Sequence, residues 1–106
     1  MRKHGNSLQN ENPHHLYEIW DEVEKNVFKF GITDDPIERD GLSKRIRTQL
    51  DFLNRAVGSQ RFVGNILHKS ILGRARAKEI EDAFIDQYFD EHGKKPRGNP
   101  VGGTRK

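Results

Sequence analysis

Apolar residues occur along this chain in short stretches of two kinds, which differ in their spacing. Strand-forming residues dominate positions 15–20 and again 27–32, and the mostly polar positions 22–26 between them are typical of a turn. Together they predict a β-hairpin that ends near Thr33. Positions 61–72 carry further aliphatic and aromatic side chains and predict a third strand with an irregular end.

Two other stretches show the three- and four-residue spacing of amphipathic helices. The first predicted helix follows a capping Ser43 and is closed by Gly58. Its apolar stripe consists of Ile46, Leu50, Leu53 and Val57. The second covers positions 74–92 and is stopped by Gly93. The order of elements is therefore strand, strand, helix, strand, helix.

A shorter helical segment is predicted between the hairpin and the first long helix. Asp35 stands directly before a proline and three residues before Glu38, which is the pattern of a capping acid followed by a helix start. We therefore expect a helical turn directly after the second strand, with Arg39 inside it and Gly41 as its end.

This order of elements and the length of 106 residues predict one α+β domain, a small three-stranded antiparallel sheet flanked by helices. Positions 1–14 are polar without apolar periodicity, and we expect them to form a leader or linker. The domain is then expected to span residues 15–99 and to be followed by a basic tail at 100–106.

The composition excludes several classes of protein. The chain has no cysteine, which rules out a disulfide-stapled scaffold, a zinc ribbon and a thiol nucleophile. Its apolar stretches are too short to cross a membrane, and its first residues lack the apolar core of a signal peptide. We therefore expect no transmembrane segment.

The net charge of +3 hides an uneven distribution of charged residues. Positions 17–40 hold eight acidic and three basic residues, whereas positions 52–78 hold six basic residues and no acid. Two interpretations stay open: a phosphate-binding surface, and a solvated surface followed by a disordered basic tail.

Glu81 occupies an unusual position in the second long helix. Ala77, Phe84 and Ile85 lie three or four residues away, so the Glu81 carboxylate leaves the helix from its apolar face. A buried carboxylate is normally paired, protonated or bound to a metal. The alternative is a residue at the edge of the stripe that reaches solvent or pairs with Arg74.

Five segments of the chain form an ordered set of motifs. They are a strand with a tyrosine, a strand ending in Gly-x-Thr, a loop leading to an arginine, a helix with a glutamate, and a Pro/Asn turn, at residues 15–19, 29–33, 34–39, 81–88 and 96–99. Taken in this order, they resemble the motifs of the GIY-YIG (URI-type) nucleases. One position departs from the family, because Lys29 stands where the second tyrosine is expected.

The resemblance implies a metal-dependent endonuclease, with DNA as the favoured substrate, in which Glu81 holds one Mg²⁺ or Mn²⁺. Tyr17 would orient or deprotonate the attacking water, Arg39 would contact the scissile phosphate, and Lys29 would add a second positive charge. Asn99 would fix the last loop against the carboxylate. Further nucleic-acid contacts are expected from Arg45, Arg47, His68, Lys69, Arg74 and Arg76.

Each of these side chains also has a purely structural interpretation. Tyr17 would pack in the core, Arg39 would pair with a neighbouring acid, and Lys29 would face solvent. Asn99 would be an ordinary turn residue, and the histidines would be solvated. Composition and periodicity alone leave these alternatives open.

The polar leader and the small size further resemble the GIY-YIG-like toxin modules that end bacterial polymorphic and contact-dependent toxins. That resemblance implies a domain of a larger delivered protein that acts in the cytoplasm of the target cell, with an acidic immunity protein as its partner. Two alternatives are a nucleic-acid-binding module without catalysis, suggested by the missing second tyrosine, and a repair or mobile-element nuclease that acts in its own cell.

Overall fold

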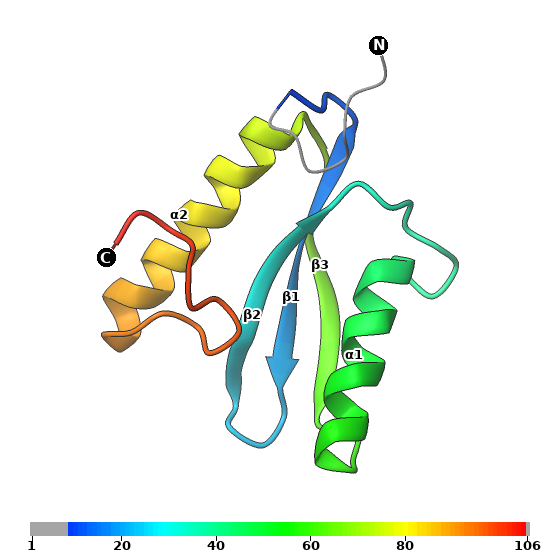
Figure 1. The fold of residues 1–106 in the computed structure, drawn as a ribbon, viewed down its shortest axis with the longest axis vertical. Coiled ribbons are helices and arrows are strands. Elements are labelled where there is room, and N and C mark those ends of the chain that lie inside the picture. Colours follow the sequence, from blue (N-terminus) through cyan, green and yellow to red (C-terminus); the bar gives the residue numbers. More distant parts are fainter. Residues whose placement is uncertain (1–8, 106) are drawn as a thin grey trace.

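The two helices of the computed structural model stand on opposite sides of a small sheet (Figure 1). The structure describes residues 9–105. Its elements are β1 (Pro13–Asp21), β2 (Asn26–Thr33), α1 (Lys44–Val57), β3 (Phe62–Leu72) and α2 (Arg74–His92). The strands form one antiparallel sheet in the order β2-β1-β3. The predicted α+β fold and its order of elements are confirmed.

The central strand β1 contributes side chains to both halves of the core. Leu16 packs with Ile32 and Ala77 on the α2 side of the sheet. The next residue, Tyr17, packs with Ile46 on the α1 side, because successive side chains of a strand point to opposite faces. One strand therefore links the packing of both helices.

Both long helices have the predicted ends. Ser43 Oγ accepts a hydrogen bond from the Ile46 N–H, and Gly58 closes α1 with a left-handed backbone at φ 71°. α2 covers residues 74–92 as predicted, and Gly93 ends it at φ 74°.

The short helical turn predicted at Asp35 is wrong, because residues 34–43 connect β2 to α1 without a helix. Asp35 does cap a helix, but this helix is α1. Its carboxylate accepts a hydrogen bond of 3.2 Å from the N–H of Arg45, which is one of the free amides of the first turn. Arg39 is left exposed in the connecting loop.

The described part of the expected leader belongs to the fold. Strand β1 begins at Pro13, and Asn10 and His14 are buried. Asn10 Nδ2 donates a hydrogen bond of 3.1 Å to Asp34, which follows β2. Residues 1–8 of the expected leader lie outside the described residues.

The described part of the expected tail is bound to α2. The N–H groups of Gly103 and Thr104 donate hydrogen bonds to Asp82 and Asp86 on that helix, at 2.9 and 2.7 Å. Figure 1 shows this segment, in red, returning along α2. The acidic side chains of α2 thus hold the end of the chain.

Asp21, at the end of β1, is a fully buried carboxylate with two arginine partners. Arg61 donates through Nε and Nη2 at 2.9 and 2.8 Å, and Arg97 donates through Nη2 at 2.7 Å. The hydrogen bonds from Arg61, reinforced by Arg97, outweigh the effect of burial and hold the pKa of Asp21 well below its ordinary value of 3.8. This cluster ties the hairpin to the last loop.

Asp21→Asn is expected to lower the free energy of unfolding by about 2 kcal/mol at neutral pH. The variant loses charge-assisted hydrogen bonds, while the two arginines stay partly solvated, which limits the cost. Urea unfolding followed by circular dichroism measures the difference. Asp51→Asn, at an exposed position of α1, is the control, and its change should stay within about 0.5 kcal/mol.

The difference in the free energy of unfolding between wild type and Asp21→Asn should depend on pH. Because the folded state depresses the pKa of Asp21, its stabilisation is complete above the ordinary value of 3.8 and is lost as the pH falls below it. The gap between wild type and Asp21→Asn should therefore narrow in acid. A gap that is unchanged from neutral pH to about pH 2 would contradict this assignment.

Candidate active site

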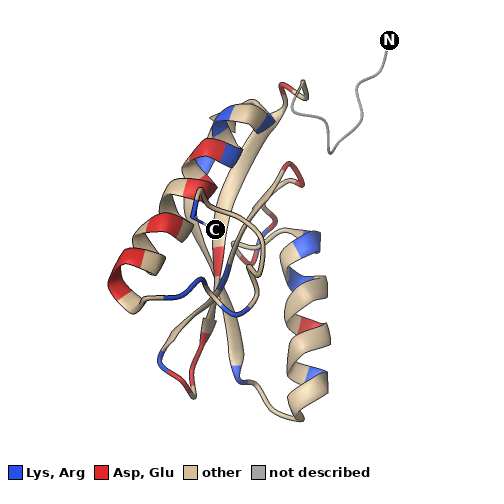
Figure 2. Ribbon diagram, turned by 60° about the vertical axis from the view of Figure 1, so that its left-hand side comes forward, with Lys and Arg blue, Asp and Glu red and all other residues tan. Residues whose placement is uncertain are grey.

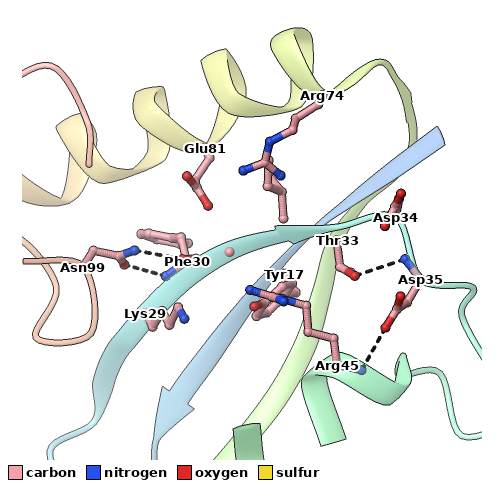
Figure 3. Close-up of a pocket in the computed structure, with 12 residues that line it drawn as sticks. Tyr17, Lys29, Phe30, Thr33, Asp34, Asp35, Arg45, Arg74, Glu81 and Asn99 are labelled. Atoms are coloured by element: carbon pink, nitrogen blue, oxygen red, sulfur yellow. Dashed lines mark hydrogen bonds between the residues drawn. The ribbon is translucent and has the colours of Figure 1, made fainter. Parts of the chain in front are cut away.

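A polar pocket opens between the two helices, with β2 along its floor (Figure 3). β2 lines it from Lys29 to Thr33, and Asp34 and Asp35 extend this edge. The other lining side chains are Tyr17 of β1, Arg45 of α1, Arg74 and Glu81 of α2, and Asn99 of the last loop. Elements that are distant in sequence thus bring together six of the side chains that were singled out from sequence.

The ring of Tyr17 lies across Gly31, its partner in the β1–β2 register. A Cβ atom at position 31 would collide with Cζ, Cε1 and the hydroxyl oxygen of Tyr17. Only glycine leaves space for the ring here. Tyr17 as a whole is 1% exposed, yet it lines the pocket. The glycine of the Gly-x-Thr motif is therefore what allows the Tyr17 ring to lie in this position.

Two polar residues, Gln49 and Lys29, form a chain of hydrogen bonds that starts at the Tyr17 hydroxyl. The hydroxyl oxygen accepts a hydrogen bond of 2.8 Å from Gln49 Nε2. Gln49 Oε1 in turn accepts one of 3.2 Å from Lys29 Nζ. Lys29, which stands where the second tyrosine was expected, is thereby connected to Tyr17 through an amide.

Burial raises the pKa of Tyr17, although the hydrogen bond from Gln49 and the charge of Arg45 act in the opposite direction. Burial lowers the pKa of Lys29, and the charge of Arg45 lowers it further. Tyr17 is therefore a neutral phenol at neutral pH, and its deprotonation depends on the donors and cations around it.

Glu81 is 7% exposed and faces the pocket from α2 (Figure 3). Its Oε1 accepts a hydrogen bond of 2.7 Å from Lys78 Nζ, so its ion-pair partner is Lys78. Burial lowers the pKa of Lys78, but the hydrogen bond and charge of Glu81 more than compensate and raise it. The second carboxylate oxygen of Glu81 accepts no hydrogen bond from the residues that the structure describes.

The carboxylate of Glu81 could serve as a ligand for a hard divalent cation. Mg²⁺ and Mn²⁺ take oxygen ligands, and Mg²⁺ is often bound through only one or two carboxylates while it keeps several waters. Glu81 presents one such oxygen to an open polar pocket. Residues 9–105 contain no group of three acidic or histidine side chains that would hold a metal. Any cation in this pocket would therefore depend on Glu81, water and a substrate oxygen.

Three cations reach the pocket without an acidic partner among residues 9–105. Arg45 of α1 and Arg74 of α2 enter the pocket from opposite sides, and Lys29 enters it from β2. Lys29 Nζ bonds to an amide, and Arg74 Nε is buried without a hydrogen-bond partner in the described chain. Figure 2 shows basic residues, in blue, at the first turns of both helices. The pocket is suited to an anion such as a phosphate.

The two other acids at the pocket edge have partners of their own. Asp34 accepts hydrogen bonds from Asn10 and Asn12, and Asp35 accepts one from the backbone of Arg45. Neither carboxylate is paired with the guanidinium of Arg45 or Arg74. These acids shape the edge of the pocket and leave its cations free.

Asn99 holds the last loop against β2, which corrects the expectation that it fixes the loop against Glu81. Its side chain accepts a hydrogen bond of 2.8 Å from the Phe30 N–H and donates one of 2.9 Å to the Phe30 carbonyl. The neighbouring Gly98 N–H donates to the Phe28 carbonyl at 2.8 Å. The loop thus pairs with the free edge of β2 as a further strand would, and closes one side of the pocket.

A family model described as URI fold toxin 2 matches residues 7–93. The chain belongs to the URI fold toxin 2 family. It is a toxin domain of the URI nuclease fold, as the resemblance of its motifs predicts. The match includes Tyr17, the Gly31-x-Thr33 motif and Glu81, and it ends before Asn99. No curated protein sequence and no solved structure matches the chain. No helix within residues 9–105 is long and apolar enough to span a membrane.

Five other side chains that were singled out from sequence lie outside the pocket of this URI fold toxin domain. Arg39, Lys69 and His68 are exposed, and the His68 ring packs against a phenylalanine of α2. Arg47 and Arg76 form ion pairs with exposed acids close to them. Arg45, six residues after Arg39, lines the pocket, whereas Arg39 does not.

Two pocket neighbours, Gln49 and Lys78, did not emerge from the sequence. Gln49 lies three residues after Ile46 and four before Leu53, so it is a polar residue on the apolar stripe of α1. The same spacing singled out Glu81 on α2 and would have found Gln49. Lys78 carried no comparable signal, since a lysine one turn before an acid is common on helix surfaces.

Gly31→Ala is expected to destabilise the domain by about 2 kcal/mol, because the new methyl group collides with the Tyr17 ring. Tyr17→Leu removes the three atoms involved, so the same glycine substitution should cost clearly less in that background. Urea unfolding of the four proteins of this cycle measures the coupling. Equal costs in both backgrounds would contradict the assigned contact.

Proposed function

We propose that this toxin domain hydrolyses phosphodiester bonds of nucleic acid, with one Mg²⁺ or Mn²⁺ held on Glu81. The observation that carries the proposal is the convergence of Lys29, Arg45 and Arg74 on the pocket that also contains Glu81 and the Tyr17 hydroxyl. A bound phosphodiester would give these cations the negatively charged partner that they lack. The Glu81 carboxylate beside that phosphate would supply a ligand for a divalent cation.

The side chains then take distinct roles. Arg45 and Arg74 would bind the phosphate from opposite sides, with Arg45 in the role that the sequence suggested for Arg39. Tyr17 would accept a proton from the attacking water once its own proton has passed to solvent. When bound, the metal would stabilise the negative charge that develops on the phosphate and the leaving oxygen.

Membership of a toxin family supports a domain delivered into the cytoplasm of a target cell as part of a larger protein. The resemblance to GIY-YIG nucleases favours DNA over RNA. An acidic immunity protein that covers the basic pocket is the partner that complementary charge favours, because such charge speeds and selects association.

A second candidate function is nucleic-acid binding without cleavage. The raised pKa of Tyr17 and the lysine at the place of the second tyrosine favour it. It predicts salt-sensitive binding and no metal-dependent cleavage of either nucleic acid.

Glu81→Gln is expected to lower the initial rate of metal-dependent cleavage of plasmid DNA by at least about 100-fold, while DNA binding in EDTA is retained. Glu79→Gln is the matched control, because Glu79 is exposed on the same helix and pairs with Arg76. Parallel assays on DNA and RNA with Mg²⁺, Mn²⁺ or EDTA make the comparison. Binding by the wild type without any cleavage would overturn the hydrolase and support the second candidate.

Arg45→Ala is expected to lower the cleavage rate by about 100-fold, since it removes a donor to the phosphate. Arg39→Ala, only six residues away but exposed outside the pocket, should change the rate less than about twofold. Single-turnover cleavage under identical salt compares the two variants. If Arg39→Ala were the more damaging substitution, the assignment of Arg45 to the phosphate would be wrong.

A further inference from the structure

Gln49 lies between Lys29 and Tyr17, and none of the sequence motifs assigns it a role. It is half-buried on α1, and its two amide atoms bond to two different pocket residues. Side-chain amides are symmetric in shape, so their orientation follows from their hydrogen-bond partners.

Lys29 determines that orientation. An ammonium group only donates hydrogen bonds, so it must face the oxygen of Gln49, at 3.2 Å. The NH₂ group of Gln49 then faces the Tyr17 oxygen, at 2.8 Å. The phenol oxygen is therefore an acceptor on this side, and its own proton must point elsewhere.

Gln49 in this orientation favours the charged form of Tyr17, as Arg45 does, whereas burial and the charge of Glu81 raise the pKa of the phenol. A hydrogen bond donated to the phenol oxygen becomes stronger when that oxygen carries a negative charge, because hydrogen bonds to charged groups are the stronger ones. With the opposite amide orientation, Gln49 would accept the phenol proton and favour the neutral form. Lys29 excludes that second orientation for as long as it carries its charge.

We propose that Gln49, oriented by Lys29, is a positioning residue that holds the Tyr17 oxygen as an acceptor and stabilises its phenolate. This inference rests on the proposed function, in which the phenolate takes one proton from the attacking water. The water O–H bond breaks and the O–H bond of Tyr17 forms. The hydroxide oxygen bonds to phosphorus as the bond from phosphorus to the leaving oxygen breaks, and that oxygen takes a proton from solvent. The phenol later returns its own proton to solvent. Lys29 thus takes part in place of a second tyrosine, through an amide.

The phenol can be titrated without any cleavage assay. The chain has two tyrosines, so Tyr88→Phe leaves Tyr17 as the single probe. Replacement of tyrosine by the more acidic 3-fluorotyrosine brings the titration to milder pH, and phenolate absorbance reports the midpoint. Gln49→Leu should raise that midpoint by about one to two pKa units, because it removes a hydrogen bond to the charged form.

Three further variants separate the amide from other effects. Gln49→Glu, nearly identical in size, replaces the donor by an acceptor and should raise the midpoint at least as far as Gln49→Leu. It also carries the test if Gln49→Leu does not fold. Lys29→Met frees the amide to turn and should raise the midpoint, whereas Lys29→Arg, which also only donates, should keep it. Gln87→Leu on the surface of α2 should leave it unchanged.

A double-variant cycle tests whether Lys29 acts through Gln49. If it does, the effect of Lys29→Met should largely disappear in the Gln49→Leu background. Full additivity would mean that Lys29 acts on Tyr17 directly and would overturn the relay. An unchanged midpoint in both Gln49 variants would overturn the proposal outright.

Failure of this proposal can be told apart from failure of the proposed function. Shifted midpoints in a protein that cleaves neither DNA nor RNA would keep the positioning role and remove the hydrolase. Cleavage by the wild type, together with unchanged titration midpoints in the variants, would keep the hydrolase and remove the positioning role. In a cleaving protein, the rate should rise with pH as Tyr17 loses its proton, and the midpoint of that rise should move with the titration midpoint, by a similar number of units.

Discussion

The pocket depends on the close packing of one aromatic ring against one backbone position. Tyr17 and Gly31 face each other where β1 pairs with β2, and the ring covers the space that a side chain would fill. This contact places the hydroxyl above β2, in reach of α1 and α2, while the rest of the ring belongs to the core. Cationic and acidic side chains from both helices meet at this point, because the central strand fixes both halves of the core.

A second constraint acts at the free edge of β2. Asn99 and Gly98 bond to the backbone of this edge, and Arg97 in the same loop bonds to the buried Asp21. The loop that closes the pocket is therefore held by hydrogen bonds at both the strand edge and the end of the hairpin. Polar contacts of the last loop thus determine the shape of the pocket on the side of Lys29.

The sequence alone predicts most of the fold and about half of the pocket. Hydrophobic spacing locates both long helices and all three strands, and the same spacing identifies Glu81 as a carboxylate on an apolar face. The capping pattern at Asp35 predicts a local turn, but the Asp35 carboxylate instead accepts a hydrogen bond from Arg45, ten residues later in the first turn of α1. The resemblance to the nuclease motifs suggested Arg39 as the phosphate contact, whereas the arginine of this region that lines the pocket is Arg45. Which arginine reaches a pocket depends on the path of a loop, and no local pattern encodes that path.

The proposed hydrolysis requires Lys29, Arg45 and Arg74 to bind a phosphodiester beside Glu81. A crystal structure of Glu81→Gln, bound to a short oligonucleotide, tests this binding mode. We expect a phosphate in the pocket, with its oxygens within hydrogen-bond distance of Lys29 Nζ and of both guanidinium groups. An oligonucleotide bound to another face, with no phosphate near these three side chains, would contradict this binding mode.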